Sequence, residues 1–119
     1  MAEPLRDAGA AMSFEDFLRV DLRVGTVLSA EPNANAKKPA YILKLDFGVL
    51  GRMTTSAPIS DGYAPAELVG RQVIAVVNLP SRLVGGIASE VQVLGATPPD
   101  AGVVLLRPDY PVANGTRIG

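Results

Sequence analysis

The chain has 119 residues, 48% of them hydrophobic, and a formal net charge of −1. This length suits one domain that buries a substantial core, and this composition excludes disorder of the whole chain. Cysteine and histidine are both absent, which excludes disulfides, thiolate nucleophiles, Cys/His zinc sites and histidine acid–base catalysis. No carboxylate or lysine pair with acid–base character emerges either, so we expect no catalytic residues, no metal and no cofactor.

The charge and the aromatic content limit the partners that the chain can bind. A protein that holds nucleic acid through many phosphates is usually basic, so nucleic acid would meet only a local cationic patch here. Aromatic residues make up 5% and tryptophan is absent, which limits base stacking. No apolar run approaches the roughly 18–20 residues of a membrane span. Residues 1–11 carry Glu3 and Asp7 without a sustained apolar stretch, so we expect no secretory signal and a cytoplasmic protein.

The N-terminal region predicts a tail followed by one short helix. Residues 1–12 are alanine-rich and without a pattern, which is typical of a flexible tail. Residues 13–16 (SFED) have the spacing of a capping box that opens a helix. The apolar side of this helix would carry Phe14, Phe17 and Leu18. A disordered lead-in is the alternative.

Six short strands are predicted after this helix. The alternation of apolar and polar residues is clearest in residues 41–47, where Tyr41 and Phe47 would belong to the core. Gly25, inside the first strand, predicts a bulge or a close approach of the backbone. The expected strands cover residues 21–30, 41–47, 52–56, 73–77, 91–95 and 103–106.

The order of these elements predicts an all-β fold. Residues 64–69 predict a short helix between the third and fourth strands, with Gly70 as its stop. Asn114 and Gly115 predict a hairpin before residues 116–118. Five or more strands without helical crossovers predict a small antiparallel barrel. Three strands, a helix and two strands is the order of the OB-fold, a five-stranded Greek-key barrel, while other barrels and sandwiches stay open from strands alone.

Residues 78–90 are the candidate binding site, because this predicted loop joins two apolar strands and carries mixed donors and acceptors. Arg82 can fork to a phosphate, or to a carboxylate or carbonyl of a peptide; the alternatives are a solvated charge and an ion pair with Glu90. Asn78 would orient a ligand or tie loop backbone. Ser89 and Glu90 would contact a ligand or close the loop by hydrogen bonds.

Three further cations and a glycine pair complete the candidates. Arg23, Lys44 and Arg52 fall on three different strands and would share the barrel face that OB-folds commonly use for binding. Each of them is alternatively a solvated charge. Gly85 and Gly86 permit unusual backbone angles, and would also let a ligand approach the backbone closely.

Several motifs give the chain a family resemblance. Residues 21–25 (DLRVG) resemble the first strand of tRNA-binding domains, and residues 68–82 (LVGRQVIAVVNLPSR) resemble their fourth strand and the loop after it. Residues 88–90 (ASE) match the Ser-Glu pair that comes next. These domains are OB-folds that occur in structure-specific RNA-binding proteins, and some aminoacyl-tRNA synthetases carry them as appended domains.

Within these domains the chain is more similar still to the CsaA family of small bacterial export chaperones. The similarity covers residues 13–119, which we expect to be the domain. RNA-binding relatives usually continue Ser-Glu with Gly-Met, whereas Val91 and Gln92 follow here. The motifs that resemble CsaA are residues 44–48 (KLDFG), 56–57 (SA), 89–95 (SEVQVLG), 103–109 (VVLLRPD) and 111–119 (PVANGTRIG).

This resemblance implies a homodimer that acts as an export-related chaperone and binds exposed segments of unfolded proteins or preproteins. The near-neutral charge and the apolar composition favour the same hypothesis. The alternative hypothesis is a tRNA-binding module of the kind associated with aminoacyl-tRNA synthetases. An enzyme that uses carboxylates is the third hypothesis and the least supported, because no acid–base pair emerges.

Overall fold

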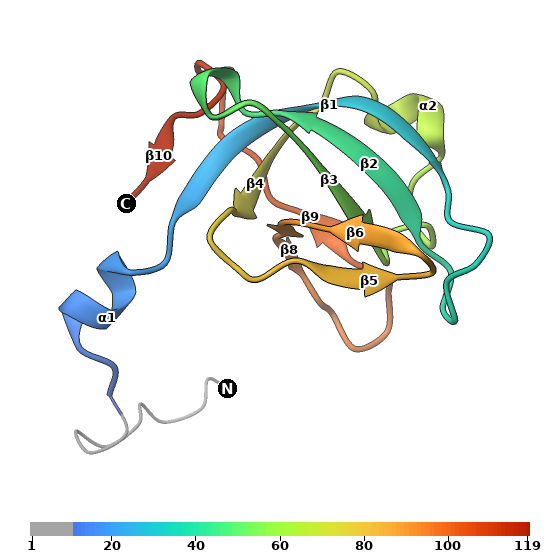
Figure 1. The fold of residues 1–119 in the computed structure, drawn as a ribbon, viewed down its shortest axis with the longest axis horizontal. Coiled ribbons are helices and arrows are strands. Elements are labelled where there is room, and N and C mark those ends of the chain that lie inside the picture. The colour runs from blue at the N-terminus through green and yellow to red at the C-terminus, as the bar shows by residue number, and fades with distance from the viewer. Residues whose placement is uncertain (1–10) are drawn as a thin grey trace.

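The computed structural model describes residues 11–119. Residues 1–10 of the predicted tail therefore lie outside the described residues. Figure 1 shows the strands wrapped around one core, with α1 standing apart from them. The helical elements are α1 (Phe14–Leu18), the 3₁₀ turn η2 (Gly48–Leu50) and α2 (Pro65–Leu68). The strands are β1 (Leu22–Pro32), β2 (Tyr41–Asp46), β3 (Arg52–Ala57), β4 (Gln72–Val76), β5 (Arg82–Val84), β6 (Ile87–Ser89), β7 (Gln92–Val93), β8 (Gly95–Ala96), β9 (Val104–Leu105) and β10 (Arg117–Ile118).

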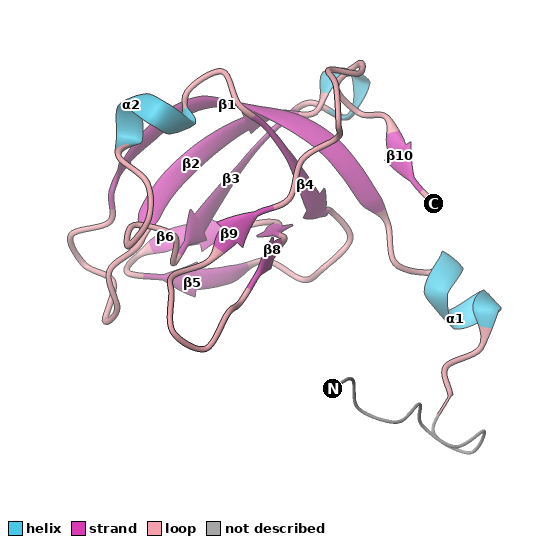
Figure 2. Ribbon diagram, turned by 180° about the vertical axis from the view of Figure 1, so that it is seen from behind, coloured by secondary structure: helices cyan, strands magenta, loops and turns pink. Residues whose placement is uncertain are grey.

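The strands form a nearly closed antiparallel barrel. The main sheet has the order β3-β2-β1-β4-β7, and β10 also pairs with β1. Two further sheets, β5-β6 and β8-β9, complete the wall on the side opposite the curved part of β1 (Figure 2). With α2 between β3 and β4 in the chain, this arrangement confirms the predicted OB-fold.

β1 departs from regular pairing in two places. The ladder to β2 shifts its register between Val27 and Ser29, which places Leu28 in a bulge. Gly25 marks a close approach instead, because a Cβ atom there would lie 2.7 Å from a ring carbon of Phe47. The second of the two expectations for Gly25 is therefore confirmed, and the bulge lies further along the strand.

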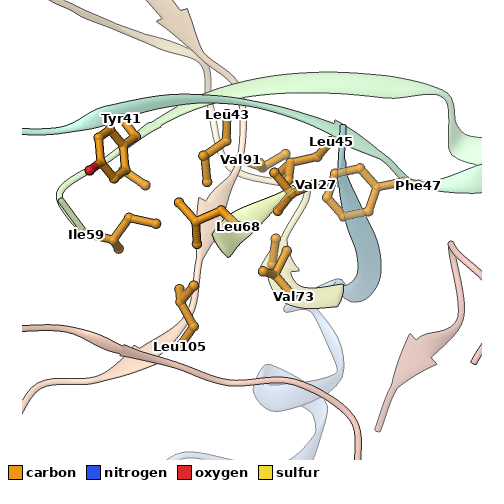
Figure 3. Close-up of a cluster of buried hydrophobic side chains, with 12 residues drawn as sticks. Val27, Tyr41, Leu43, Leu45, Phe47, Ile59, Leu68, Val73, Val91 and Leu105 are labelled. Carbon is orange, nitrogen blue, oxygen red and sulfur yellow. The ribbon is translucent and has the colours of Figure 1, made fainter. Parts of the chain in front are cut away.

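The core lies between β1, β2, β4 and α2. Alternation along β2 turns Tyr41, Leu43 and Leu45 inward, and Phe47 follows directly after the strand. Figure 3 shows these side chains gathered around Leu68 of α2. All of them are buried, which confirms that Tyr41 and Phe47 belong to the core. Each such side chain contributes on the order of 1.5–3 kcal/mol by its removal from water.

The predicted strand at 91–95 is wrong in one respect, because it forms two short strands with different partners. β7 pairs with β4, and β8 pairs with β9. Leu94 lies at the change of partner: its N–H donates to Ile74 O at 2.9 Å, and its carbonyl accepts from Leu106 N at 3.1 Å. The chain thus leaves one sheet and enters the next within a few residues.

The hairpin predicted at Asn114 and Gly115 is wrong, because β10 pairs with β1 rather than with the segment just before it. The Asn114 Oδ1 atom accepts hydrogen bonds from Thr26 Oγ1 at 2.7 Å and from Gln72 Nε2 at 3.1 Å. Gly115 N donates to the backbone of β1. These contacts fasten the C-terminal segment across β1 and β4. Asn114 and Gly115 do form a turn, closed by Thr116 N donating to Ala113 O at 3.1 Å, but it leads into the pairing with β1.

α1 forms with the predicted cap. The Ser13 Oγ atom accepts a hydrogen bond from Asp16 N at 3.1 Å, which satisfies one of the amide groups that a helix start leaves without a partner. None of the residues of α1 is buried. Within the described range, neither this helix nor any other is long and apolar enough to cross a membrane.

Candidate functional site

The predicted loop at 78–90 contains a hairpin that the sequence analysis missed. β5 and β6 pair antiparallel, with Arg82 opposite Ser89 at the base. Gly85 and Gly86 join the two strands with φ angles of 58° and 80°. A type I′ turn requires positive φ at both central residues, so the glycine pair serves the geometry of this turn.

Ser89 and Glu90 fasten the hairpin to the edge of β3. Ser89 is 5% exposed, and its Oγ atom accepts a hydrogen bond from Ser56 N at 3.1 Å and lies 3.0 Å from Thr55 Oγ1. Glu90 N donates to Thr54 O at 2.8 Å, and Thr54 N donates to Glu90 Oε1 at 2.9 Å. The Glu90 carboxylate thus accepts a hydrogen bond from β3, in the place of a backbone carbonyl of a neighbouring strand. Ser89 and Glu90 were predicted either to contact a ligand or to close the loop by hydrogen bonds. The hydrogen bonds of both residues close the loop.

Asn33 holds the far end of the hairpin, and sequence reasoning missed it. It follows β1, is 7% exposed, and donates from Nδ2 to Val84 O at 3.0 Å and to Ser56 Oγ at 3.1 Å. Its Oδ1 atom accepts from Asn35 N at 3.3 Å. One amide therefore joins the β1–β2 loop, β3 and β5. Its sequence neighbourhood predicts only a polar loop, so no local signal points to this role.

A groove of about 630 Å³ lies between the β1–β2 loop and β5. Lys37, Lys38 and Arg82 bring three positive charges to it, and its apolar lining includes Ala40 and Pro58. Among the residues that the structure describes, no carboxylate and no aromatic side chain lines this groove. The groove is therefore suited to a ligand that is partly apolar and partly anionic.

Arg82 lies where this groove meets a second hollow. The second hollow has about 350 Å³, is formed at the base of the hairpin, and is lined by Leu79, Pro80 and Val91 among others. Arg82 is exposed and, within residues 11–119, forms no ion pair. The alternative pairing with Glu90 is thus not formed, because that carboxylate accepts from the backbone of β3. The guanidinium can therefore bind a ligand.

Asn78 and Arg23 organise the N-terminal side of the barrel. Asn78 accepts from Asp21 N at 3.0 Å and donates from Nδ2 to Arg19 O at 2.6 Å, so it ties backbone between α1 and β1. Arg23 Nε lies 2.6 Å from Asp21 Oδ1, and its Nη1 atom donates to Gly115 O at 3.0 Å. Both side chains are engaged within the protein, away from the groove.

Lys44 and Arg52 lie together on the outer face of β2 and β3. Both are exposed, and the register pairs Lys44 with Thr54 and Arg52 with Asp46. Arg23 points to the inner face of β1. Residues two apart on a strand point to the same face, and Gly25 faces the core. The three cations therefore do not share one face, and only Arg82 of the predicted cations lines the groove.

The groove can hold a ligand by apolar contacts, by charge and by backbone hydrogen bonds. Across residues 11–119, acidic side chains do not gather in a group of three or more that could hold a metal ion. The two lysines of the groove come from the β1–β2 loop and Arg82 comes from β5. In an OB-fold, the loops that follow the first and fourth strands flank the usual binding surface.

The family follows from one match. The model of the putative tRNA-binding domain matches residues 22–117. The chain belongs to this family. Among curated proteins, methionine–tRNA ligase of Porphyromonas gingivalis is 42% identical over 107 residues, or 90% of this chain. This tRNA-binding domain spans 15% of the length of that ligase.

Among solved structures, two chaperones are similar to this chain over their whole length. The chaperone CsaA of Bacillus anthracis is 49% identical, with a TM-score of 0.88 over 92% of this chain and 100% of that chain. The CsaA chaperone of Picrophilus torridus is 40% identical, with a TM-score of 0.86 and the same coverage. The resemblance to the CsaA family is therefore confirmed.

Proposed function

We propose that this tRNA-binding domain is a non-catalytic chaperone of the CsaA type, which binds exposed, extended segments of unfolded proteins or preproteins before export. The observation that carries the proposal is the groove, which combines three cations with an apolar lining. The similarity to the CsaA chaperones, whose whole chains are covered, supports it further. A protein that holds preproteins before export would act in the cytoplasm.

The lining of the groove favours a peptide over a single-stranded nucleic acid. Proteins that hold single strands combine positive charge with aromatic side chains on which the bases stack. The groove has the charge, at Lys37, Lys38 and Arg82, while no aromatic residue of the described chain lines it. Apolar side chains and carboxylates of a peptide would instead find matching contacts on Pro58, Ala40 and these cations.

α1 is the main reason to propose a homodimer. A helix of five residues is not stable alone in water, yet no residue of α1 is buried and Phe14 is 70% exposed. The C-terminal end of the helix is nevertheless held, since Arg117 Nη2 donates to Leu18 O at 2.9 Å and Asn78 to Arg19 O. A fixed helix with an uncovered apolar side suits a second copy of this chain that covers it.

Replacing Phe14 and Leu18 together with serine is expected to convert the dimer into a monomer, because it removes the apolar side of α1. Sedimentation velocity at matched protein concentrations measures the change. Val49→Ser is the control, since Val49 is 99% exposed on another element and its change should leave the mass as it is. A double variant that keeps the mass of a dimer would contradict this role of α1, and a monomeric parent protein would contradict the dimer itself.

Binding of tRNA is the second candidate function, and the match to methionine–tRNA ligases favours it. The three cations of the groove would then meet phosphates. Affinity would fall with salt, with a slope of log affinity against log salt of about −2 for three phosphate contacts on a single strand. Binding to an unfolded protein through apolar contacts would change much less over the same range of salt.

A paired titration separates the two functions. Labelled bulk tRNA and a labelled unfolded protein are each titrated with the parent protein at low and at moderate salt. Arg82→Ala is expected to weaken binding of the unfolded protein by about three- to tenfold, because an exposed hydrogen bond contributes only about 0.7–1.4 kcal/mol to binding. Arg107→Ala, which removes an exposed charge outside this groove, is the matched control.

The outcomes lead to different conclusions. Client binding that persists at moderate salt, together with weak and rapidly screened tRNA binding, supports the chaperone. Saturable tRNA binding that survives moderate salt and is lost with Arg82→Ala supports the RNA-binding module instead. No measurable affinity for any unfolded protein would rule out the chaperone.

A further inference from the structure

β5 presents one of its edges to the groove. On its other side β5 pairs with β6, and among the described strands it has no second partner. All three residues of β5, Arg82, Leu83 and Val84, line the groove, whereas none of the described residues of β6 does so. Neighbouring residues of a strand point to opposite faces, so three in succession line the same groove only where it follows the strand edge. The groove therefore runs along the side of β5 that faces away from β6.

The register of the hairpin identifies the backbone groups on this edge. In a hairpin with a two-residue turn, the two residues that flank the turn exchange both backbone hydrogen bonds, and the next pair exchanges none. Val84 and Ile87 flank the turn, and Leu83 lies opposite Ala88. The N–H and C=O of Leu83 are therefore directed away from β6, into the groove. The Leu83 side chain, 79% exposed, stands beside them.

We propose that the groove binds an extended segment of a client by adding it to β5 as a new antiparallel strand, in which the N–H and C=O of Leu83 exchange both hydrogen bonds with the client residue opposite. This inference rests on the proposed chaperone function and specifies its ligand. The ligand is an unfolded segment of a few residues without proline at the paired position. It carries an apolar side chain near Leu83 and acidic side chains that meet Lys37, Lys38 and Arg82.

Addition of a strand explains how one groove can serve clients of different sequence. The backbone groups of a peptide are the same in every sequence, so hydrogen bonds to them supply affinity, while side-chain contacts supply preference. The preference here is for acidic segments, because the lining carries three cations and, within the described part of the chain, no carboxylate.

The edge is also held ready for a ligand. Asn33 Nδ2 donates to Val84 O, and the contacts of Ser89 hold the other strand of the hairpin against β3. A peptide would thus meet a strand that is already ordered, which lowers the entropic cost of binding. Since Val84 O is directed toward β6 and Asn33, the hydrogen bonds that hold the hairpin do not use the Leu83 groups.

Backbone methylation of a peptide tests the proposal on the unaltered protein. The probe is a fluorescent peptide of about nine residues, long enough for an extended strand of about 30 Å, with one leucine among alternating aspartate and serine. Each backbone nitrogen is methylated in turn, and the affinity is measured by fluorescence anisotropy. Methylation at the position opposite Leu83 is expected to weaken binding at least about tenfold, the equivalent of about 1.4 kcal/mol, while methylation of its two neighbours is tolerated.

A pair of variants provides the same test from the side of the protein. Leu83→Pro removes the N–H that the peptide would use, and proline is accepted on strand edges where that N–H has no ladder partner. Leu83→Ala keeps the N–H and is the matched control. Loss of peptide binding with proline but not with alanine, at unchanged circular dichroism, supports strand addition. Should the proline variant unfold, the methylation scan on the unaltered protein decides alone.

Strand addition and the chaperone function are contradicted by different results. A peptide that binds with the same affinity wherever it is methylated would overturn strand addition and leave the chaperone function standing. A protein that binds neither these peptides at millimolar concentration nor the labelled unfolded protein of the paired titration would overturn both. A peptide in which lysine replaces aspartate should bind more weakly, and equal affinity would contradict the assigned role of the three cations.

Discussion

Replacing Phe47 with alanine is expected to lower the free energy of unfolding by about 3–5 kcal/mol, as for other fully buried aromatic side chains. Phe47 has no exposed surface, and its ring packs against Gly25 of β1 in the centre of the barrel. Because the chain has no tryptophan, unfolding by urea is followed by far-ultraviolet circular dichroism at a fixed protein concentration. Val49→Ala, at a fully exposed position nearby, should change stability by less than about 0.5 kcal/mol.

The close approach of Phe47 to Gly25 makes a sharper test. Gly25→Ala places a Cβ atom 2.7 Å from a ring carbon, and such overpacking costs about 1–3 kcal/mol. In the Phe47→Ala background the ring is absent, so the same change should cost much less. Additive effects in this double-mutant cycle would show that the two residues do not contact each other as described.

Replacing Gly85 with alanine is expected to abolish peptide binding and to lower stability by about 1–3 kcal/mol. The φ angle of Gly85 is 58°, a conformation that costs a residue with a Cβ about 1–2 kcal/mol. Its Cβ atom would also lie 2.7 Å from Ala36 N and 2.7 Å from Asn35 C. These are backbone atoms and cannot rotate away, so the hairpin and the β1–β2 loop must separate, and the groove between them changes shape.

Gly86→Ala is the matched control for this prediction. Its φ angle of 80° brings a comparable strain, but no heavy atom lies within 4 Å of the Cβ that it would gain. Gly86→Ala should therefore lower the unfolding temperature less than Gly85→Ala, and only Gly85→Ala should lose affinity in the anisotropy titration. Equal loss in both variants would mean that the turn itself, and not its contact with the β1–β2 loop, sets the affinity.

The fold was largely predictable, because the signals that specify it are local. Alternation in residues 41–47 predicted β2 (Tyr41–Asp46) to within one residue, and Gly70 correctly marked the end of α2. The failures have a common cause. Asn114 and Gly115 have the local chemistry of a hairpin, yet the side chain of Asn114 finds partners on β1 and β4, which are far away in the sequence. The local preference for a turn is met, since Thr116 N donates to Ala113 O, but long-range contacts decide which strand the following residues pair with.

The site was less predictable for the same physical reason. Ser89 and Glu90 carry groups that bind ligands in many proteins, and only their distance from β3 shows that they fasten a hairpin. Asn33 bonds to Val84, 51 residues away, and nothing in its own neighbourhood indicates a partner. Lys37 and Lys38 were not among the predicted site residues, and only the fold places them with Arg82 in the lining of the groove. Residue types were visible in the sequence; their neighbours were not.

The pairing of β1 has a consequence for the order in which the chain can fold. Leu22, near the start of β1, pairs with Val76 on one side and with Ile118 on the other. On the ribosome, β1, β2 and β3 can form a meander as soon as they emerge, whereas the first half of β1 waits for partners that are synthesised much later. Contacts of such long range slow folding, and an unpaired strand edge is prone to aggregation in the meantime. A nascent chain therefore carries, until β10 has left the ribosome, the same kind of exposed segment that we propose the folded domain to bind in other proteins.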